Sequence, residues 1–422
     1  MNKVSVPPST VATSNIGQFI NGRSVQSGRA TFENRHPATN AVIGVVHEAD
    51  ADLVDQAVAA ARAALKGPWG KTTPQERATI LRKVAAGITA RFDEFLAAEI
   101  MDTGKPVSTA SHVDIPRGAA NFNFFADQIL TVANETFNTP TPDGRVALNY
   151  ALRKPRGVIA VVCPWNLPLL LMTWKVAPAL ACGNTVVVKP SEETPATATL
   201  LGEVMNEAGV PPGVYNVVHG LGPHSAGEYL VSHPDVDGIT FTGETRTGAA
   251  IMKSAAQFVR PVSFELGGKN AALVFADANM DAAIEGTMRS VFANCGQVCL
   301  GTERVYVQRP IYNEFVARLK QGAAVLVSGD PFAKGTTLGP VISAEHKQKV
   351  LSFYAKARSE GAEIIHGGGV QDMPSPYTDG HWIEPTIWTG LPETSAIMRD
   401  EIFGPCCHIT PFDDEDAAIA MA

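Results

Sequence analysis

The chain has 422 residues, of which 45% are hydrophobic and 18% are charged, and its formal net charge is -8. This is the composition of a globular protein, and a chain of this length is expected to form two or three domains rather than one core. The negative charge argues against a protein that binds nucleic acid or an anionic membrane, and no apolar run is long enough to span a bilayer.

The N-terminal part is predicted to be a flexible extension followed by strands and then helices. Residues 1–16 are polar, rich in Ser, Thr and Pro, and lack the apolar core of a signal peptide. Short strands and turns are expected over Gln18–Val46. A capping box, in which Thr73 precedes Glu76 by three residues, opens one helix. Helical periodicity covers Asp50–Lys66, Phe92–Met101 and Ile115–Leu130.

The periodicity then changes from helical to alternating. Apolar residues occupy every second position after a Pro-Asp-Gly turn, at Val146, Leu148, Tyr150 and Leu152. This pattern predicts an exposed hairpin over residues 135–152. Because a hairpin that projects between two larger units presents unpaired edges, we expect it to serve oligomerisation.

Strands and helices alternate from Gly157 onward, which predicts an α/β protein with parallel sheets. The strands of the first unit are expected at Gly157–Cys163, Thr185–Lys189, Val214–Val218 and Val236–Thr242, and its helices at Leu169–Ala181, Ala196–Ala208, Pro223–Ser232 and Glu244–Phe258. Residues 17–134 and 153–262 together are assigned to a Rossmann-like dinucleotide-binding domain. Ligands of such sheets bind at the carboxyl ends of the strands.

A second α/β domain is expected over residues 263–422. Its strands are predicted at Ala272–Phe275, Arg304–Val307, Glu363–His366 and Trp382–Thr389, and its helices at Asp281–Phe292, Ile311–Val325 and Glu345–Arg358. Asp413–Ala422 is predicted to begin a helix, because acidic side chains stabilise a helix N-terminus. The chain stops inside that element, so we expect a truncated C-terminus.

Two segments at strand ends are candidates for binding a dinucleotide. Gly243 and Gly248 lie where a strand runs into a helix, whose free amides attract phosphate, although an ordinary strand-to-helix turn has the same pattern. Lys189 and Glu192 follow a buried strand, where a carboxylate would bind ribose hydroxyls and repel a 2′-phosphate. A solvated strand end is the alternative for that pair.

Three residues are candidates for carbonyl chemistry. Glycines follow Glu265, and a carboxylate in such a flexible segment can serve as a base. Prolines on both sides of Asn166 would fix its amide as an oxyanion donor, although a simple turn asparagine is the alternative. Cys299 and Cys295 are both possible nucleophiles, and either could instead be a buried small apolar residue.

The cysteine content indicates a reducing compartment. Six cysteines in a chain of this length do not form a disulfide framework, so a cytoplasmic protein is expected. Cys295 and Cys299 have no clustered histidines near them in the sequence, so we expect no metal site.

Five motifs in this order resemble the aldehyde dehydrogenase superfamily, and the resemblance extends from about Gly17 to the end of the chain. They are Pro164-Trp165-Asn166, Phe241-Thr242-Gly243, Phe264–Lys269, Gly296–Cys299 and Glu401–Pro405. The resemblance implies that Cys299 is the nucleophile, that Glu265 is the general base, and that Asn166 with the Cys299 backbone amide forms the oxyanion hole. It implies NAD as cofactor, with contacts at Lys189, Glu192, Gly243, Glu244, Gly248, Leu266, Glu401, Phe403 and Trp165. Lys175 matches a lysine near the active site.

The resemblance also implies a reaction and a substrate class. An aldehyde would add to the thiol, lose hydride to NAD and leave as an acid after hydrolysis of a thioester. Longer passages are most similar to the family members that oxidise 2-hydroxymuconic or 2-aminomuconic 6-semialdehyde in the degradation of aromatic compounds. Arg117 matches an arginine proposed to bind the remote carboxylate of such substrates, with Leu170 as a further contact, although a surface helix arginine is the alternative.

Other functions stay open at this level. Relatives are dimers or tetramers, so a homodimer or homotetramer is expected for the full-length form, with no nucleic acid or membrane partner. Family chains continue past Ala422, so a truncated member that binds NAD with little activity is one alternative. A dehydrogenase of broad specificity is a second alternative. A cysteine hydrolase that uses Cys299 and Glu265 without a cofactor is a third.

Overall fold

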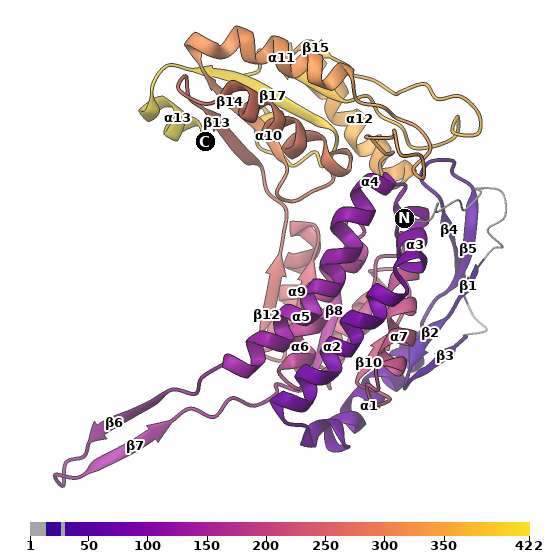
Figure 1. The fold of residues 1–422 in the computed structure, drawn as a ribbon, viewed down its shortest axis with the longest axis vertical. Helices are drawn as coiled ribbons and strands as arrows, with labels where there is room; N and C mark the ends of the chain where they lie inside the picture. Colours follow the sequence, from indigo (N-terminus) through magenta and orange to yellow (C-terminus); the bar gives the residue numbers. More distant parts are fainter. Residues whose placement is uncertain (1–13, 27–29) are drawn as a thin grey trace.

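The computed structural model describes residues 14–26 and 30–422 (Figure 1). The molecule has two arms, each a sheet covered by helices: the first arm contains the seven-stranded sheet and the second arm the five-stranded sheet. A long hairpin leaves the first arm, and the whole has a C-shaped outline. Across the described ranges, no helix combines the length and the apolar character that crossing a membrane requires.

The first sheet has seven strands in the order β12-β11-β8-β9-β10-β2-β3, in which β12 through β10 run parallel and β2 and β3 are antiparallel additions. The strands are β2 Gln18–Ile20, β3 Arg23–Val25, β8 Val158–Val162, β9 Thr185–Lys189, β10 Tyr215–Val217, β11 Gly238–Thr242 and β12 Val262–Glu265. The predicted parallel α/β class is therefore confirmed.

Both faces of this sheet are buried, because successive side chains of a strand point to opposite sides. On β9, Val186 and Val188 belong to the core beneath one layer of helices, whereas Val187 belongs to the core beneath the other. The first layer contains α2 Pro74–Ala90, α3 Phe92–Thr103, α5 Ile115–Thr131, α6 Pro168–Ala181 and α7 Ala196–Glu207. The second contains α1 Ala51–Lys66, α8 Ala226–Ser232 and α9 Thr245–Ala256.

Local signals set the helix ends, and one of them, the capping box at Thr73, was predicted. The Asp50 side chain accepts the Leu53 N–H at 3.0 Å and caps α1. In the capping box of α2, the Thr73 hydroxyl accepts the Glu76 N–H at 3.2 Å, and the Glu76 carboxylate accepts the Thr73 N–H at 2.7 Å. Helix α3 ends at Gly104, whose φ of 67° is the left-handed conformation that glycine adopts without strain. A short helix α4 Val107–Thr109 and a π-helical turn Ala110–Asp114 lead into α5.

The predicted hairpin is present as β6 Thr136–Pro140 and β7 Val146–Tyr150. It extends far from the body of the molecule (Figure 1). Phe137, Val146, Leu148 and Tyr150 are 58 to 65% exposed, which is unusual for large apolar side chains.

The second sheet has five strands in the order β13-β14-β17-β16-β15, and only β15 is antiparallel to its neighbour. The strands are β13 Asn270–Val274, β14 Thr302–Gln308, β15 Glu363–His366, β16 Thr386–Thr389 and β17 Cys406–Phe412. Helices α10 Met280–Phe292 and α11 Tyr312–Ala324 pack on one face, and α12 Ala344–Ser359 packs on the other. The helix predicted at the chain end is α13 Glu415–Met421.

Four sequence predictions need correction. Ser14–Ile16, assigned to the flexible extension, form β1, which pairs with β5 Val42–His47 beside β4 Thr31–Arg35; the rest of that extension lies outside the described residues. Strand β16 begins at Thr386 rather than Trp382, because Pro385 has no N–H for the sheet. Strands β12 and β17 were not predicted. Because β12 pairs with β11 through Glu265, the first sheet extends past residue 262, where the second domain was expected to begin.

Candidate active site

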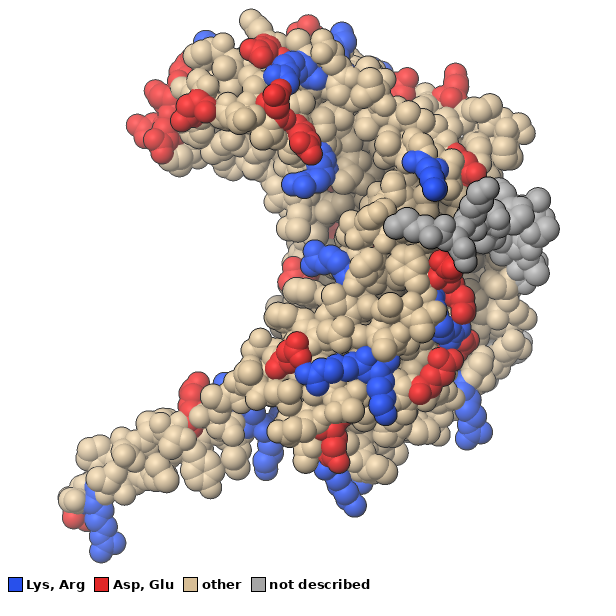
Figure 2. Space-filling model, in the orientation of Figure 1, with Lys and Arg blue, Asp and Glu red and all other residues tan. Residues whose placement is uncertain are grey.

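The parallel strands of the first sheet end at one edge, and the predicted site residues follow those ends. Val162 of β8 is in register with Lys189 of β9 and with Phe241 of β11, and Thr242 is in register with Glu265. The segments that begin with Cys163, Pro190, Gly243 and Leu266 therefore leave the sheet side by side. This edge faces the hollow between the two arms, which Figure 2 shows with acidic and basic side chains scattered around it.

Cys299 lies on a loop from the second arm that reaches this edge. The loop follows a short 3-10 turn, Ala293–Gly296, in which Asn294 and Cys295 have φ values of 51° and 57°. Such left-handed conformations are uncommon outside glycine and persist where neighbouring structure enforces them. The Cys299 carbonyl accepts the Asn270 Nδ2–H at 2.7 Å. Cys299 is half-buried whereas Cys295 is 1% exposed, so only Cys299 can meet a substrate.

The Cys299 thiol is in an environment that opposes its ionisation. Burial is the largest cause that raises its pKa, and the carboxylates of Glu265 and Glu401 raise the pKa further. Backbone N–H groups of Cys299 and Leu300 lower the pKa by hydrogen bonding to the sulfur. The structure therefore brings Glu265 into electrostatic reach of the thiol, which sequence spacing alone did not do. A thiol of this kind needs a base before it can attack a carbonyl.

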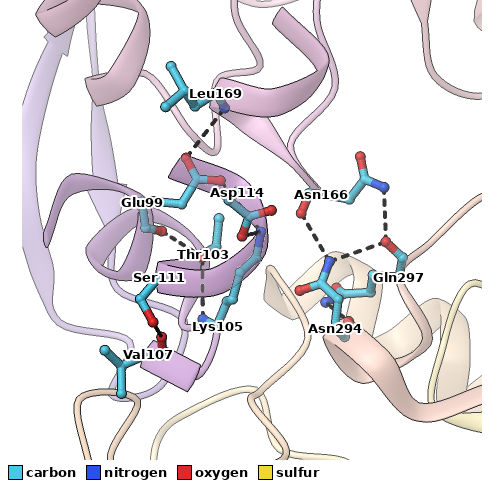
Figure 3. Close-up of polar contacts among 10 residues, drawn as sticks. All are labelled: Glu99, Thr103, Lys105, Val107, Ser111, Asp114, Asn166, Leu169, Asn294 and Gln297. Atoms are coloured by element: carbon cyan, nitrogen blue, oxygen red, sulfur yellow. Dashed lines mark hydrogen bonds and ion pairs between the residues drawn. The ribbon is translucent and has the colours of Figure 1, made fainter. Parts of the chain in front are cut away.

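The Asn166 side chain is fixed by the loop that carries Cys299 (Figure 3). Its Nδ2 donates to the Gln297 carbonyl at 2.9 Å, and the Asn294 Nδ2 donates to the Asn166 carbonyl at 2.9 Å. An asparagine amide has two N–H donors, and one of them is used here. The hydrogen bond of the first N–H fixes the plane of the amide, and so it also fixes the direction of the second N–H. A preorganised oxyanion donor requires such a fixed direction.

A buried charge cluster holds the helix that follows Asn166 (Figure 3). The Glu99 carboxylate accepts the N–H of Leu169, in the first turn of α6, at 3.3 Å. The Lys105 Nζ lies 3.4 Å from Glu99 Oε1 and 2.8 Å from Asp114 Oδ2, and all three side chains are fully buried. The first turn of α6 is therefore anchored from α3, on the opposite side from the Gln297 contact.

Glu265 lines a cavity of about 360 Å³ between α5, α6 and the first sheet, which neither Cys299 nor Asn166 lines. Phe125, Trp174 and Lys175 also line it. The Lys175 Nζ donates to the Thr240 hydroxyl at 3.1 Å, and burial lowers its pKa more than the neighbouring Cys163 and Glu265 raise it. A carboxylate at the wall of a cavity has room for a water molecule between itself and a substrate.

The groups expected to hold a dinucleotide lie along the same edge. The buried Lys189 Nζ is 3.3 Å from the Glu192 carboxylate, whose side chain is 41% exposed. Helix α9 begins at Thr245, after Gly243 and the N-cap residue Glu244, and none of the described side chains caps it, so its first amides stay open to an anion. A Cβ at Gly248 would lie 2.8 Å from Leu266, so glycine permits close packing there. An open carboxylate and an uncapped helix fit a dinucleotide without a 2′-phosphate.

Glu401 and Phe403 approach this edge from the second arm. The Gly268 N–H donates to Glu401 Oε1 at 3.1 Å, and a Cβ at Gly267 would lie 2.2 Å from the same carboxylate. The Phe403 ring packs edge-on against Trp165, with 5.4 Å between ring centroids.

Arg117 and Leu170 lie on neighbouring helices. Arg117 is exposed on α5, next to Gly118, where an added Cβ would lie 2.8 Å from Leu169. Leu170 is buried, and its carbonyl accepts the Asn121 Nδ2–H at 3.1 Å. Leu170 therefore belongs to the first turn of α6, and Gly118, the neighbour of Arg117, packs on Leu169 of the same turn.

Sequence reasoning missed the residues that orient the candidate site. Gln297 lies within the cysteine motif Gly296–Cys299 and Asn294 lies two residues before it, so their place in the sequence was an available signal. Glu99 and Glu303 had none, because each acts on backbone groups far away in the chain, at Leu169 and at residues 402 and 403.

Comparisons with known proteins agree with this geometry. The model of the aldehyde dehydrogenase family matches residues 24–422. A 2-hydroxymuconic semialdehyde dehydrogenase of Pseudomonas sp. (strain CF600) is 66% identical over 409 residues, which are 96% of this chain and 84% of that protein. A 2-aminomuconic 6-semialdehyde dehydrogenase of Pseudomonas sp. is 54% identical over 404 residues, 96% of this chain and 82% of that protein.

Solved structures are similar over the whole chain. The NAD+ complex of an aldehyde dehydrogenase from Bacillus cereus has a TM-score of 0.93 and 36% identity, and covers 100% of this chain and 84% of that one. The crystal structure of a putative aldehyde dehydrogenase from Burkholderia cenocepacia has a TM-score of 0.93 and 37% identity, and covers 96% of this chain and 82% of that one.

Proposed function

Because the chain belongs to the aldehyde dehydrogenase family, we propose that it oxidises the aldehyde group of 2-hydroxymuconic 6-semialdehyde, or of the 2-amino analogue, to a carboxylate. The chain is an NAD-dependent aldehyde oxidoreductase. The observation that carries the proposed chemistry is the half-buried Cys299 thiol, under the electrostatic influence of Glu265 and on the loop whose Gln297 carbonyl accepts a hydrogen bond from the Asn166 amide.

The first proposed step is addition of Cys299 to the aldehyde. Glu265 takes the thiol proton, directly or through a water in the adjoining cavity, and the sulfur forms a bond to the carbonyl carbon. The carbonyl oxygen becomes an alkoxide, which accepts the free N–H of Asn166 and the backbone N–H of Cys299. An aldehyde alone is a poor hydride donor, whereas this tetrahedral alkoxide is a good one.

NAD supplies the hydride acceptor when it is bound. Loss of hydride from the tetrahedral carbon leaves a thioester on Cys299. Glu265, which has by then released the thiol proton to solvent, takes a proton from a water molecule, whose oxygen adds to the thioester carbon. The carbon–sulfur bond breaks, and the acid and the Cys299 thiolate are released.

The cofactor contacts follow the chemistry of the donor groups. We assign the adenosine ribose to Lys189 and Glu192, the pyrophosphate to the turn formed by Gly243 and Glu244, and the nicotinamide ribose and ring to Glu401 and Phe403. Support comes from the open Glu192 carboxylate and the uncapped start of α9. Gly248, Leu266 and Trp165 pack behind these groups.

Arg117 is the proposed partner of the substrate carboxylate, and Leu170 is a further contact. Arg117 is exposed beside the first turn of α6, so its guanidinium is free to bind a carboxylate. Arg117→Ala should raise KM for the semialdehyde acid about tenfold and leave KM for an uncharged aldehyde unchanged. Arg309→Ala, at an exposed arginine of the second arm, is the matched control and should change neither KM. Equal losses on both substrates would remove Arg117 from this role.

The substrate proposal is tested by comparing kcat/KM for the two semialdehydes and for a short aliphatic aldehyde. We expect one of the semialdehydes to be preferred by about 10²-fold or more over the aliphatic aldehyde. Equal kcat/KM for all three would instead establish a dehydrogenase of broad specificity.

We further propose the domain organisation and assembly expected from the sequence. Residues 17–134 and 153–265 form the dinucleotide unit, with β12 as its last strand, and the catalytic unit follows. A cytoplasmic location is supported by six free cysteines. The hairpin at 135–152 pairs with another copy in a homodimer or homotetramer, supported by its exposed apolar side chains. Light scattering of Leu148→Asp beside the parent protein tests this; an unchanged oligomer would contradict the proposal.

A further inference from the structure

The loop that carries Glu401 and Phe403 is held by a carboxylate that the proposed chemistry does not use. Glu303, near the start of β14, accepts the Phe403 N–H at 2.8 Å. Its two oxygens lie 3.1 and 3.0 Å from the Ile402 nitrogen, whose N–H they share. The Glu303 side chain is only 9% exposed, so these hydrogen bonds are shielded from water.

Lys269 completes this contact from the opposite side. Its Nζ forms an ion pair with the Glu303 carboxylate and donates to the Asp400 carbonyl at 2.7 Å. Lys269 ends the glycine-containing segment that begins at Glu265, and Arg304 Nε donates to the Lys269 carbonyl at 2.9 Å. The pair therefore joins the segment after β12 to the loop at residues 400–403.

The loop needs such support because its backbone is strained. Phe403 has a φ of 62°, in the left-handed region that non-glycine residues rarely adopt. Such conformations persist only where the surroundings fix them. Besides Glu303, the loop is held by His346, whose Nε2 lies 2.7 Å from the Phe403 carbonyl and whose pKa burial lowers to about 4, so the neutral ring donates this bond.

We propose that Glu303, paired with Lys269, is a positioning residue that sets where the Glu401 carboxylate and the Phe403 ring meet the nicotinamide half of NAD. This inference rests on the proposed roles of Glu401 and Phe403. Without the Glu303 carboxylate, the buried Ile402 N–H loses its acceptor, and the Lys269 ammonium loses its counter-ion and keeps only the Asp400 carbonyl. The backbone at Phe403 can then relax. Even a small shift matters at Glu401, because its carboxylate already packs against Gly267 so closely that a Cβ there would lie 2.2 Å away.

The effect should be confined to one half of the cofactor. Of the proposed adenosine contacts, Lys189 ends β9 of the first sheet and Glu192 follows it, whereas Glu303 lies on β14 in the second sheet. A variant that only destabilises the fold would weaken both halves of the cofactor site. A displaced loop would weaken the nicotinamide half alone.

The test measures NAD and ADP binding to Glu303→Gln by titration calorimetry, since ADP has the adenosine and pyrophosphate but no nicotinamide ribose. We expect the Kd of NAD to rise about tenfold and the Kd of ADP to stay within about twofold of the parent value. The kinetic isotope effect with a deuterated aldehyde should also rise, because a displaced nicotinamide slows hydride transfer. Glu393→Gln is the matched control, because the Glu393 carboxylate accepts a hydrogen bond from Tyr306 of β14, the strand that also carries Glu303. It should change neither the Kd of NAD nor the Kd of ADP.

Lys269→Met is the second variant, and it leaves the carboxylate and its backbone hydrogen bonds in place. Lys269→Met should raise the ratio of the Kd of NAD to the Kd of ADP, as Glu303→Gln does, but by a smaller factor. Suppose that the parent enzyme reduces NAD but the ratio of the Kd of NAD to the Kd of ADP is unchanged in the variants that fold. The proposed positioning role of Glu303 would then be wrong. Failure of the parent enzyme to reduce NAD with any aldehyde would instead refute the proposed function.

Discussion

Replacing Lys105 by methionine should destabilise the protein strongly. The Lys105 ammonium is the cation of the described cluster that neutralises Glu99 and Asp114, at 3.4 and 2.8 Å, and all three side chains are fully buried. Removing one partner of a buried pair leaves an uncompensated charge, which costs about 3–5 kcal/mol of unfolding free energy. Because Glu99 also accepts the Leu169 N–H, the start of α6 beside Asn166 should loosen as well.

The loss of unfolding free energy in Lys105→Met should increase with pH. Burial is the largest cause that raises the pKa of Glu99 and of Asp114, and Lys105 lowers both. A carboxyl group whose folded pKa lies above its unfolded value binds its proton more tightly in the folded state. Its contribution therefore becomes unfavourable as pH rises above the ordinary carboxyl range. Without Lys105 the folded pKa values rise further, so Lys105→Met should cost more at pH 9 than at pH 6.

Urea unfolding at the two pH values measures this effect. Lys83→Met, at an exposed position of α2, is the matched control and should stay within about 0.5 kcal/mol of the parent. A loss under about 1 kcal/mol for Lys105→Met at pH 9 would refute the argument that the cluster depends on this charge. A larger loss at pH 6 than at pH 9 would show that the carboxyl groups are not the cause.

Three further predictions concern the reaction. Glu265→Gln should slow hydrolysis of the thioester more than its formation, so an initial burst of NADH should precede a steady rate lowered about 10²-fold. Mass spectrometry should then detect acylated Cys299. A variant that shows neither the burst nor the acylated cysteine would contradict the role of Glu265 as base. Asn166→Ala should lower kcat about 10²- to 10³-fold while alkylation of Cys299 by iodoacetamide proceeds at the parental rate. Because burial raises the pKa of Cys299, the alkylation rate of the cofactor-free enzyme should still increase between pH 8.5 and 9.5, and a plateau below pH 8.5 would disprove that environment.

Local chemistry made much of the fold predictable. The capping box at Thr73 and the stop at Gly104 act within one helical turn, so they determine helix ends regardless of the rest of the chain. The run Thr185–Lys189 is apolar at successive positions because both faces of β9 are buried, and this indicates a parallel sheet. Strand β12 escaped prediction because it is a short edge strand whose partner is given only by the fold.

The fold class, the enzyme family and the candidate residues follow from the amino-acid order alone, since ordered motifs and helix and strand periods are properties of the chain. Only the tertiary structure decided which cysteine is accessible, how Asn166 is held by Gln297 and Asn294, and that Glu303 supports the loop at Phe403. These contacts join segments about a hundred or more residues apart. Hydrogen bonds and burial depend on distances in space, and a linear pattern does not contain those distances until the core has packed.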